Sequence, residues 1–423
     1  MTLPLASLFA ALLAAPAPEP VIALRAARLF DGIGEMRARM TVLVRGGHIA
    51  AVGERVDVPA GAEVIDLGDA TLLPGLIDAH THLALHAGDY DRQILRETPE
   101  LRTIHAVVSA RKTLEAGVTT VRDLGNEAAG FADIALRDAV REGLVPGPRV
   151  LAAIRPVTST GAYALTGYSP YLVTPPLSSS ADGVGEVRKE VRRLLAQGAD
   201  VIKIYMESYE KKQPREDVLS GAMNYSKEEL AALVEEAHRG HVKVAAHTYS
   251  DEAAQVALDV GVDSIEHGLY LSEATFRRMA KQGTVYVPTL LVYELWRDGQ
   301  IFGGITPEKK AQLARTCEEH AKSFRRALAS GVKIAFGSDT FELPGTNPRE
   351  LELLVREGMK PLDALRAGTS VSAALLGVDG VTGALKPALA ADVIAVRGDP
   401  RTSMSVLREV LLVMKDGRIH LRR

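Results

Sequence analysis

The feature that most constrains the fold is a regular alternation of short apolar runs and helix-like segments through the middle of the chain. Eight runs read as buried strands: GLIDAHTHL, TTVRDLG, RVLAAI, DVIKIY, KVAAHTY, DSIEHG, VYVPTL and KIAFGSD. Most of the helix-like segments between them begin at Asp or Ser or end at Gly. This order predicts an α/β fold, a (β/α)8 TIM barrel. An open doubly wound sheet is the alternative, but no G-x-G-x-x-G follows the first run.

The two ends of the chain have a different pattern. Residues 21–72 and 380–423 read as short strands, including the hairpin-like texts RGGHIAAVG and EVLLVMKDGRIHL. Neither end alone has enough strands to bury one face of a sheet. We therefore predict that both ends form one small β-sandwich domain, which leaves residues 73–379 for the barrel.

The first twenty residues are considered apart from the fold. Residues 3–15 form an apolar run that is too short to span a bilayer. The run resembles the core of a secretory signal peptide, although no Lys or Arg precedes it. A signal would place the protein in the periplasm or outside the cell. A disordered apolar extension on a cytoplasmic protein is the alternative.

Charge and cysteine content narrow the possible functions. Lys and Arg total 50 and Asp and Glu total 53, so no excess of positive charge favours nucleic acid or an anionic membrane as partner. The single cysteine, Cys317, excludes an intramolecular disulfide and a multi-cysteine zinc site. Any metal ion must therefore be held by histidine and carboxylate.

Potential metal ligands fall at the carboxyl ends of the predicted strands. His80 and His82 end the first run two positions apart, which places both on one face of a strand. His247 ends the fifth run, His267 the sixth and Asp339 the eighth. In a barrel these ends share one mouth, where imidazoles and a carboxylate suit zinc, or alternatively manganese, cobalt or iron. Each histidine taken singly could instead be a hydrogen-bonded core residue.

Lys203 lies in the fourth run, between Ile202 and Ile204. An ammonium group does not bind a metal, but burial near cations favours the neutral amine. A neutral amine can react with carbon dioxide to give a carbamate, which is a carboxylate able to bridge two metal ions. Spacing alone favours the alternative, a lysine in a buried ion pair or one that reaches the rim.

Several phrases together resemble the metal-dependent amidohydrolase superfamily: PGLIDAHTH, GADVIKIY, KVAAHTY, DSIEHG and FGSD. GVTTVRDLG, AHRGHVKVAAH and GVDSIEHGLYLSEATFRRMAKQG resemble the branch of Xaa-Pro dipeptidases, related dipeptide-cleaving carboxypeptidases and ochratoxin-degrading amidohydrolases. The resemblance extends from residue 21 to the C terminus. It implies two divalent cations, zinc first among them, held by six ligands: His80, His82, carboxylated Lys203, His247, His267 and Asp339.

The resemblance also implies a reaction, the hydrolysis of an amide by a hydroxide held between the two cations. Asp339 would accept a proton from the attacking water and deliver it to the leaving nitrogen. The substrate would be an N-acyl amino acid or a dipeptide that releases its C-terminal amino acid, aromatic amides of the ochratoxin A type included. A mononuclear deaminase or cyclic-amide hydrolase on the same barrel is the alternative, and a non-catalytic scaffold is another. Relatives are often homo-oligomers.

Two long loops, residues 158–183 and 206–225, follow strands and are expected to line the substrate site. Many relatives carry a TGGH-like stretch in the first loop, whose His helps to polarise the substrate carbonyl. This chain has Tyr163 instead, which could donate its phenolic proton. We assign Tyr163 a catalytic role and, with Tyr205, a substrate-binding role; His86 reads as a loop residue. Further candidate holders of the substrate carboxylate, with no preference among them, are Tyr168, Lys211, Lys212, Arg215 and Arg297.

Overall fold

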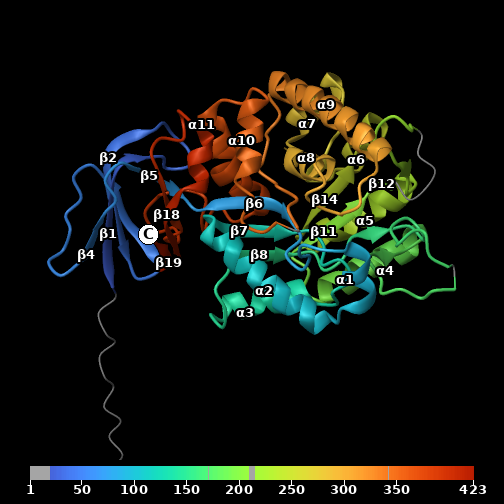
Figure 1. Ribbon diagram of the computed structural model, residues 1–423, viewed down its shortest axis with the longest axis horizontal. Helices are drawn as coiled ribbons and strands as arrows, with labels where there is room; N and C mark the ends of the chain where they lie inside the picture. Colours follow the sequence, from blue (N-terminus) through green and yellow to red (C-terminus); the bar gives the residue numbers. More distant parts are fainter. Residues whose placement is uncertain (1–19, 170, 209–214, 342) are drawn as a thin grey trace, which may run out of the picture.

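The computed structural model describes residues 20–169, 171–208, 215–341 and 343–423 (Figure 1). Apart from Pro20, the signal-like segment predicted for residues 1–20 therefore lies outside the described residues. Among the residues that are described, none of the helices combines the length and the apolar character that a bilayer span requires.

The two ends of the chain contribute to one sheet of eight strands. These are β1 (Val21–Leu29), β2 (Arg37–Arg45), β3 (His48–Gly53), β4 (Glu63–Asp66), β5 (Ala70–Pro74), β17 (Val393–Arg397), β18 (Val410–Lys415) and β19 (Arg418–Arg422). Their order is β19-β18-β17-β5-β1-β2-β3, and β4 pairs with β1. Figure 1 shows blue and red strands side by side at the left. The predicted hairpins at Gly46-Gly47 and Asp416-Gly417 join β2 to β3 and β18 to β19.

The middle of the chain forms two parallel sheets. One has the order β6-β7-β8 and contains β6 (Leu76–Thr81), β7 (Val118–Asp123) and β8 (Arg149–Ala152). The other has six strands: β9 (Val157–Thr158), β10 (Ser179–Ser180), β11 (Val201–Tyr205), β14 (Lys243–Thr248), β15 (Ser264–His267) and β16 (Val285–Val287). A short hairpin, β12 (Glu207–Ser208) with β13 (Ala222–Met223), follows β11. The expected α/β class and seven of the expected strands are thus present.

The eighth expected strand, residues 333–339, is reduced to a single bridge between Ile334 and Tyr286. This segment nevertheless lies against β6, because Ala79 N donates to Phe336 O and Asp339 N donates to His80 O, both at 2.8 Å. At the other edge, Asp200 N donates to Ala152 O at 2.8 Å. Among the described residues, no continuous ladder joins the two sheets.

A close approach explains the irregularity of this segment. A Cβ atom on Gly337 would lie 2.3 Å from Val287 Cγ1 and 2.9 Å from the Cβ of His80. Asp339 adopts a φ of 51°, which a regular strand cannot contain. Glycine at position 337 therefore allows this segment to lie close to β6, and the segment departs from strand geometry at Asp339.

Helices follow most of the central strands. They are α1 (Tyr90–Arg96), α2 (Pro99–Glu115), α3 (Ala132–Arg141), α4 (Gly183–Ala196), α5 (Lys227–Arg239), α6 (Asp251–Val260), α7 (Glu273–Gln282), α8 (Leu290–Arg297), α9 (Pro307–Ser330), α10 (Arg349–Arg356), α11 (Pro361–Arg366) and α12 (Ser372–Leu376). The helix-capping residues expected from the sequence are present. Ser226 and Glu229 form a capping box at the start of α5, and α6 and α7 end at glycines in the left-handed conformation.

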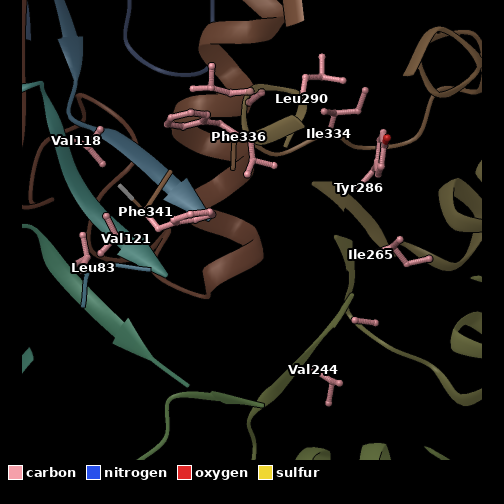
Figure 2. Packing of buried hydrophobic residues seen from close by; sticks show 14 of the residues in the cluster. Leu83, Val118, Val121, Val244, Ile265, Tyr286, Leu290, Ile334, Phe336 and Phe341 are labelled. Atoms are coloured by element: carbon pink, nitrogen blue, oxygen red, sulfur yellow. The ribbon is translucent and has the colours of Figure 1, made fainter. Parts of the chain in front are cut away.

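The largest apolar core lies between the central strands and these helices. Figure 2 shows part of it, with Val244, Ile265 and Tyr286 on successive strands of the six-stranded sheet and Val121 on the other sheet. A separate apolar core, which includes Leu24, belongs to the sheet formed by the two ends of the chain. The carboxyl ends of the central strands are thus supported from behind by packed side chains, and they provide a firm base for polar groups.

Candidate functional site

The structure places five of the six predicted metal ligands at or just beyond the carboxyl ends of strand segments and Lys203 in the middle of β11, and none of the six is more than 8% exposed. The four imidazoles form a chain of neighbouring rings. The ring centroids of His82 and His80 are 5.5 Å apart, those of His80 and His267 are 5.1 Å apart, and those of His267 and His247 are 4.5 Å apart. Four buried imidazoles this close together are unusual for a purely structural core.

Asp339 joins this chain of rings. Its Oδ1 lies 3.3 Å from Nε2 of His82 and 3.6 Å from Nε2 of His80, and its Oδ2 lies 3.9 Å from Nδ1 of His267. One ligand atom from each of His80, His82 and Asp339 lies within 4.8 Å of the others, a spacing that a single cation can bridge. Two nitrogens and one carboxylate oxygen form a donor set that suits zinc and similar divalent ions.

A buried ion network fixes the orientation of His80. Its Nδ1 contacts Glu266 Oε2 at 2.8 Å, while Oε1 of the same carboxylate accepts from Arg122 Nη2 at 2.8 Å and from Ser264 Oγ at 2.5 Å. Arg122 also donates from Nε to the carbonyl of Ala79 at 2.6 Å. The carboxylate holds the proton of His80 on Nδ1, so that Nε2 is left to face Asp339 with its lone pair.

Two other imidazoles have neutral hydrogen-bond partners. Nδ1 of His82 contacts the carbonyl of Gly125 at 2.8 Å, and Nδ1 of His267 contacts Thr289 Oγ1 at 2.8 Å. His267 and Thr289 have positive φ values of 69° and 53°, which are uncommon for residues other than glycine. Strained backbone of this kind persists where the surrounding structure enforces it, and it often marks functional sites.

Two buried nitrogen atoms in the cluster have no hydrogen-bond partner among the described residues: Nζ of Lys203 and Nε2 of His247. An unsatisfied buried polar atom destabilises a protein by about 1–3 kcal/mol. Two such atoms beside His80 and Asp339 indicate that something else completes the cluster. A metal centre fits this requirement, because His247 could coordinate through Nε2 and a modified Lys203 could coordinate through oxygen.

The electrostatics of the cluster favour neutral imidazoles. Burial, and then the charge of Lys203, lowers the pKa of His80 and His247 well below the usual range, and burial does the same for His267. Neutral imidazole is the form that binds a metal. Burial lowers the pKa of Lys203 to about 8, which makes its neutral amine more accessible than that of an exposed lysine.

His82 behaves differently because it faces Asp339. Burial opposes the charged ring, but the hydrogen bond and the charge of Asp339 raise the pKa of His82 to about 9. Burial likewise opposes the charged form of Asp339, yet His80 and His82 bring its pKa below the usual value. The position between His82 Nε2 and Asp339 Oδ1 therefore attracts a positive charge, either a proton or a metal cation.

A cavity of about 440 Å³ opens above the cluster. Tyr163 and Tyr205 both line it, and their rings stack at 4.9 Å. Tyr205 also stacks on His247 at 4.2 Å. The hydroxyl of Tyr163 donates to Glu127 Oε2 at 2.8 Å, and that of Tyr90 donates to the same oxygen at 2.7 Å. The phenol of Tyr163 is thus held at the cavity wall by a buried carboxylate.

The remaining sequence candidates lie elsewhere. Tyr168 donates to Asp91, Arg215 pairs with Asp217, and Arg297 pairs with Asp298; none of these three lines the cavity. Lys211 and Lys212 lie outside the described residues. As expected, His86 belongs to a loop, where it contacts Glu97 and stacks on His105.

Sequence reasoning missed several groups that the structure places at the site. Glu266 and Arg122 belong to the strand-like runs DSIEHG and TTVRDLG, but the sequence pattern predicts no role for either residue. Alternation along a strand would place Glu266 and His267 on opposite faces, and only the positive φ of His267 brings both to the cluster. Glu127 gave no signal, because it lies in a connection beyond β7.

Imidazoles and a carboxylate gathered at the carboxyl ends of parallel strands are typical of metal-dependent hydrolases. The chain belongs to the amidohydrolase family, whose family model matches residues 71–420. The predicted resemblance is confirmed, including the prolidase-like branch. The protein is accordingly a hydrolase that acts on amide bonds of small molecules, within a family that is generally metal-dependent.

Individual relatives support the same branch. The ochratoxinase of Aspergillus niger is 31% identical over 427 residues, which cover 92% of this chain and 85% of the relative. A solved Xaa-Pro dipeptidase with methionine bound in its active site superposes with a TM-score of 0.85 at 31% identity, covering 94% of this chain and 99% of that one. A prolidase complexed with N-methylphosphonate-L-proline has a TM-score of 0.84 at 28% identity, covering 95% and 100% of the two chains.

Proposed function

We propose that the protein is a dinuclear metal-dependent hydrolase of N-acyl amino acids or dipeptides, from which it releases the C-terminal amino acid. The observation that carries the dinuclear part is the pair of unsatisfied buried nitrogens on Lys203 and His247, next to a cluster that already offers three ligands. The names of the relatives support the substrate class, since they include a Xaa-Pro dipeptidase and an ochratoxinase.

The proposed ligands divide into two groups around carboxylated Lys203. His80 and His82 with Asp339 would hold one cation, and His247 with His267 would hold the other. Imidazole-rich donors favour zinc. When bound, divalent cations lower the pKa of water from about 15.7 towards 7 and polarise the amide carbonyl.

The residues of the chain supply binding and proton transfer. Asp339 takes the proton of the attacking water and passes it to the amine that leaves, because an amine without this proton is a poor leaving group. Glu266 keeps the lone pair of His80 directed at the site. Tyr163 donates its one proton to Glu127 in this structure, and it would redirect that proton to the substrate carbonyl when substrate binds; Tyr205 packs against the substrate from the cavity wall.

The walls of the cavity favour an aromatic acyl group or side chain. Its aromatic lining includes Tyr90, Tyr249, Tyr293, Trp296, Phe302 and Phe341. Aromatic rings pack well against other rings and against flat amides. We therefore include aromatic amides of the ochratoxin A type among the proposed substrates.

The proposal also includes a more detailed description of the fold. We propose that the two central sheets are parts of one closed (β/α)8 barrel over residues 73–379, since backbone hydrogen bonds link them at both edges. Residues 21–72 and 380–423 would then form the β-sandwich domain.

The deciding experiment is a screen of the zinc-loaded enzyme against N-acyl amino acids, dipeptides and ochratoxin A-type amides, with detection of the free amino acid that is released. Release of a C-terminal amino acid, together with two zinc ions per chain by elemental analysis, is the expected result. A single essential metal ion with activity only on deaminase or cyclic-amide substrates would replace the proposal with the mononuclear alternative.

A further inference from the structure

A second group of potential metal ligands lies at the two ends of α1 and on α2, and it shares no residue with the imidazole cluster around Asp339. It consists of His86, Glu97 and His105, each of which offers one ligand atom within 4.8 Å of the other two. The side chains of His86 and Glu97 are 21% and 13% exposed. Two imidazoles and one carboxylate are a donor set that zinc uses when its fourth position is left to water.

Hydrogen bonds from buried side chains fix the backbone around this group. Gln93, which is 1% exposed, accepts from His86 N at 3.1 Å and donates to the carbonyl of His86 at 2.8 Å. Arg102 donates from Nε to the carbonyl of Ala84 at 2.7 Å. His105 stands one turn further along α2, and its ring stacks on that of His86 with the centroids 3.7 Å apart. The ligands are therefore held close together by the protein alone.

The ring of His86 is oriented as in a metal-binding histidine. Its Nδ1 lies 3.0 Å from the carbonyl of Ala87, and its Nε2 lies 2.9 Å from Glu97 Oε2. A carbonyl only accepts, so Nδ1 carries a proton, and in the neutral ring the lone pair of Nε2 then faces a carboxylate. Two acceptors at this distance require a cation between them, either a second proton or a metal ion. Metal-binding histidines commonly donate their other N–H to a backbone carbonyl in this way.

His105 favours the metal ion over the proton. Within the described part of the chain, its ring nitrogens have no hydrogen-bond partner. Partial burial, and then the charge of His86, lowers the pKa of His105, so that its ring is neutral at pH 7. Neutral imidazole is the form that binds a metal. A proton between His86 and Glu97 would make no use of this ring, whereas a metal ion would take it as a third ligand.

We propose that His86, Glu97 and His105 bind a divalent transition-metal ion, zinc first among them, at a site separate from the imidazole cluster. Three ligands and partial exposure make this site weaker than the buried cluster, so gel filtration should remove its ion and leave the cluster loaded. The site does not depend on the proposed function.

The position of the site gives the ion a structural role. It would join the segment before α1, the end of α1 and the first half of α2. The segment enclosed in this way carries Leu85, Tyr90 and Asp91, all of which line the cavity. A bound ion would therefore stabilise one part of the cavity wall.

The test is a zinc titration of the gel-filtered holoenzyme by calorimetry, with His105→Phe as the variant. Phenylalanine keeps a flat ring to stack on His86 and removes both nitrogen donors. Wild type should bind one additional equivalent of zinc. His105→Phe should bind it at least about 100-fold more weakly, since groups that only support a metal ligand already account for about 10- to 100-fold. Glu97→Gln, which removes the carboxylate charge, should also weaken binding.

The matched control is His238→Gln. Nε2 of His238 lies 2.9 Å from Asp263 Oδ2, as in the pair of His86 and Glu97, but among the described residues no third ligand completes that pair. This variant should bind the additional zinc as wild type does. Hydrogen exchange locates the ion, because amides of residues 83–97 should exchange more slowly after zinc is added to wild type but not to His105→Phe.

The outcomes decide the assignment without reference to amide hydrolysis. Loss of the additional zinc in His105→Phe and Glu97→Gln, with slower exchange of residues 83–97 in wild type, would support it. If the ion survives gel filtration, elemental analysis should find one zinc more in wild type than in His105→Phe. Wild type that binds no additional zinc, or His105→Phe that binds it as tightly as wild type, would overturn the site and leave His86 and Glu97 as an ion pair. An enzyme that binds this zinc but hydrolyses no amide would contradict the proposed function only.

Discussion

The two halves of the imidazole cluster differ in how fully the protein satisfies their polar atoms. In the half formed by His80 and His82, each Nδ1 has a partner and each Nε2 faces Asp339. In the half formed by Lys203, His247 and His267, Lys203 Nζ and His247 Nε2 have no partner among the described residues. The rings of the first half are oriented by the protein alone, whereas the second half has two atoms that a bound group would complete.

The contrast has a consequence for how the site assembles. A preorganised set of ligands loses little freedom when a cation binds, so the first half should hold its cation more tightly than the second. On the proposed function, the second half depends on carboxylation of Lys203, and therefore on a reaction with carbon dioxide from solution. The two proposed cation sites should accordingly respond differently to changes in their residues.

The largest effect is expected from Asp339→Asn, because the carboxylate of Asp339 faces both halves and is the proposed carrier of the proton. Asparagine keeps an oxygen in the same place, so metal content should stay close to that of wild type. Loss of proton transfer should lower kcat by about 10³-fold. Initial rates and elemental analysis of the same preparation measure the two quantities, and near-normal kcat would remove Asp339 from the mechanism.

The second effect concerns Lys203→Ala, which removes the proposed bridge between the halves. Metal content should fall, more at the His247–His267 side, and kcat/KM should drop by on the order of 100-fold or more, because a bound cation is worth several kcal/mol. Short carboxylic acids should restore part of the activity, since they can occupy the space of the carbamate. Full metal content in Lys203→Ala would contradict the bridging role.

The positions of the six proposed ligands could be predicted from the sequence because five of them end strand-like runs and Lys203 lies within one, and parallel strands place such ends together. The runs around His80, Lys203, His247 and His267 all became strands. The run before Asp339 did not, because Gly337 packs tightly against β6 and β16 and Asp339 turns to positive φ. Periodicity describes regular strands, and it carries no signal for such a departure.

The residues that orient the proposed metal ligands, and those that line the cavity from distant helices, were much harder to predict from the sequence. Glu266 contacts His80 across 186 residues of chain, and Arg122 reaches Glu266 across 144. Such partners depend on the relative height of two strands, which the sequence pattern does not determine. Lys309 stands in a helix beyond the seventh strand, and only the three-dimensional arrangement brings it to the cavity.

A third prediction tests the well-satisfied half through Glu266→Gln. Glutamine can accept from only one of His80 and Arg122, because its amide nitrogen donates, and it removes the negative charge that holds the proton on His80 Nδ1. Metal affinity or kcat/KM should fall by about 10- to 100-fold, as for other carboxylates that support a ligating histidine. Metal competition with a chelator measures the affinity. An unchanged affinity would show that His80 is positioned without Glu266.

The smallest effect is expected in the other half, from Thr289→Val. Valine keeps the branched shape at a residue with positive φ but removes the hydroxyl that contacts His267 Nδ1 at 2.8 Å. A neutral hydrogen bond contributes about 0.5–1.5 kcal/mol, so kcat/KM should fall by about 2- to 10-fold. Thr289→Ser is the matched control, since it keeps the hydroxyl. If Thr289→Val lowers metal affinity as much as Glu266→Gln does, the two halves are equally dependent on their supporting groups, and the difference in preorganisation does not govern binding.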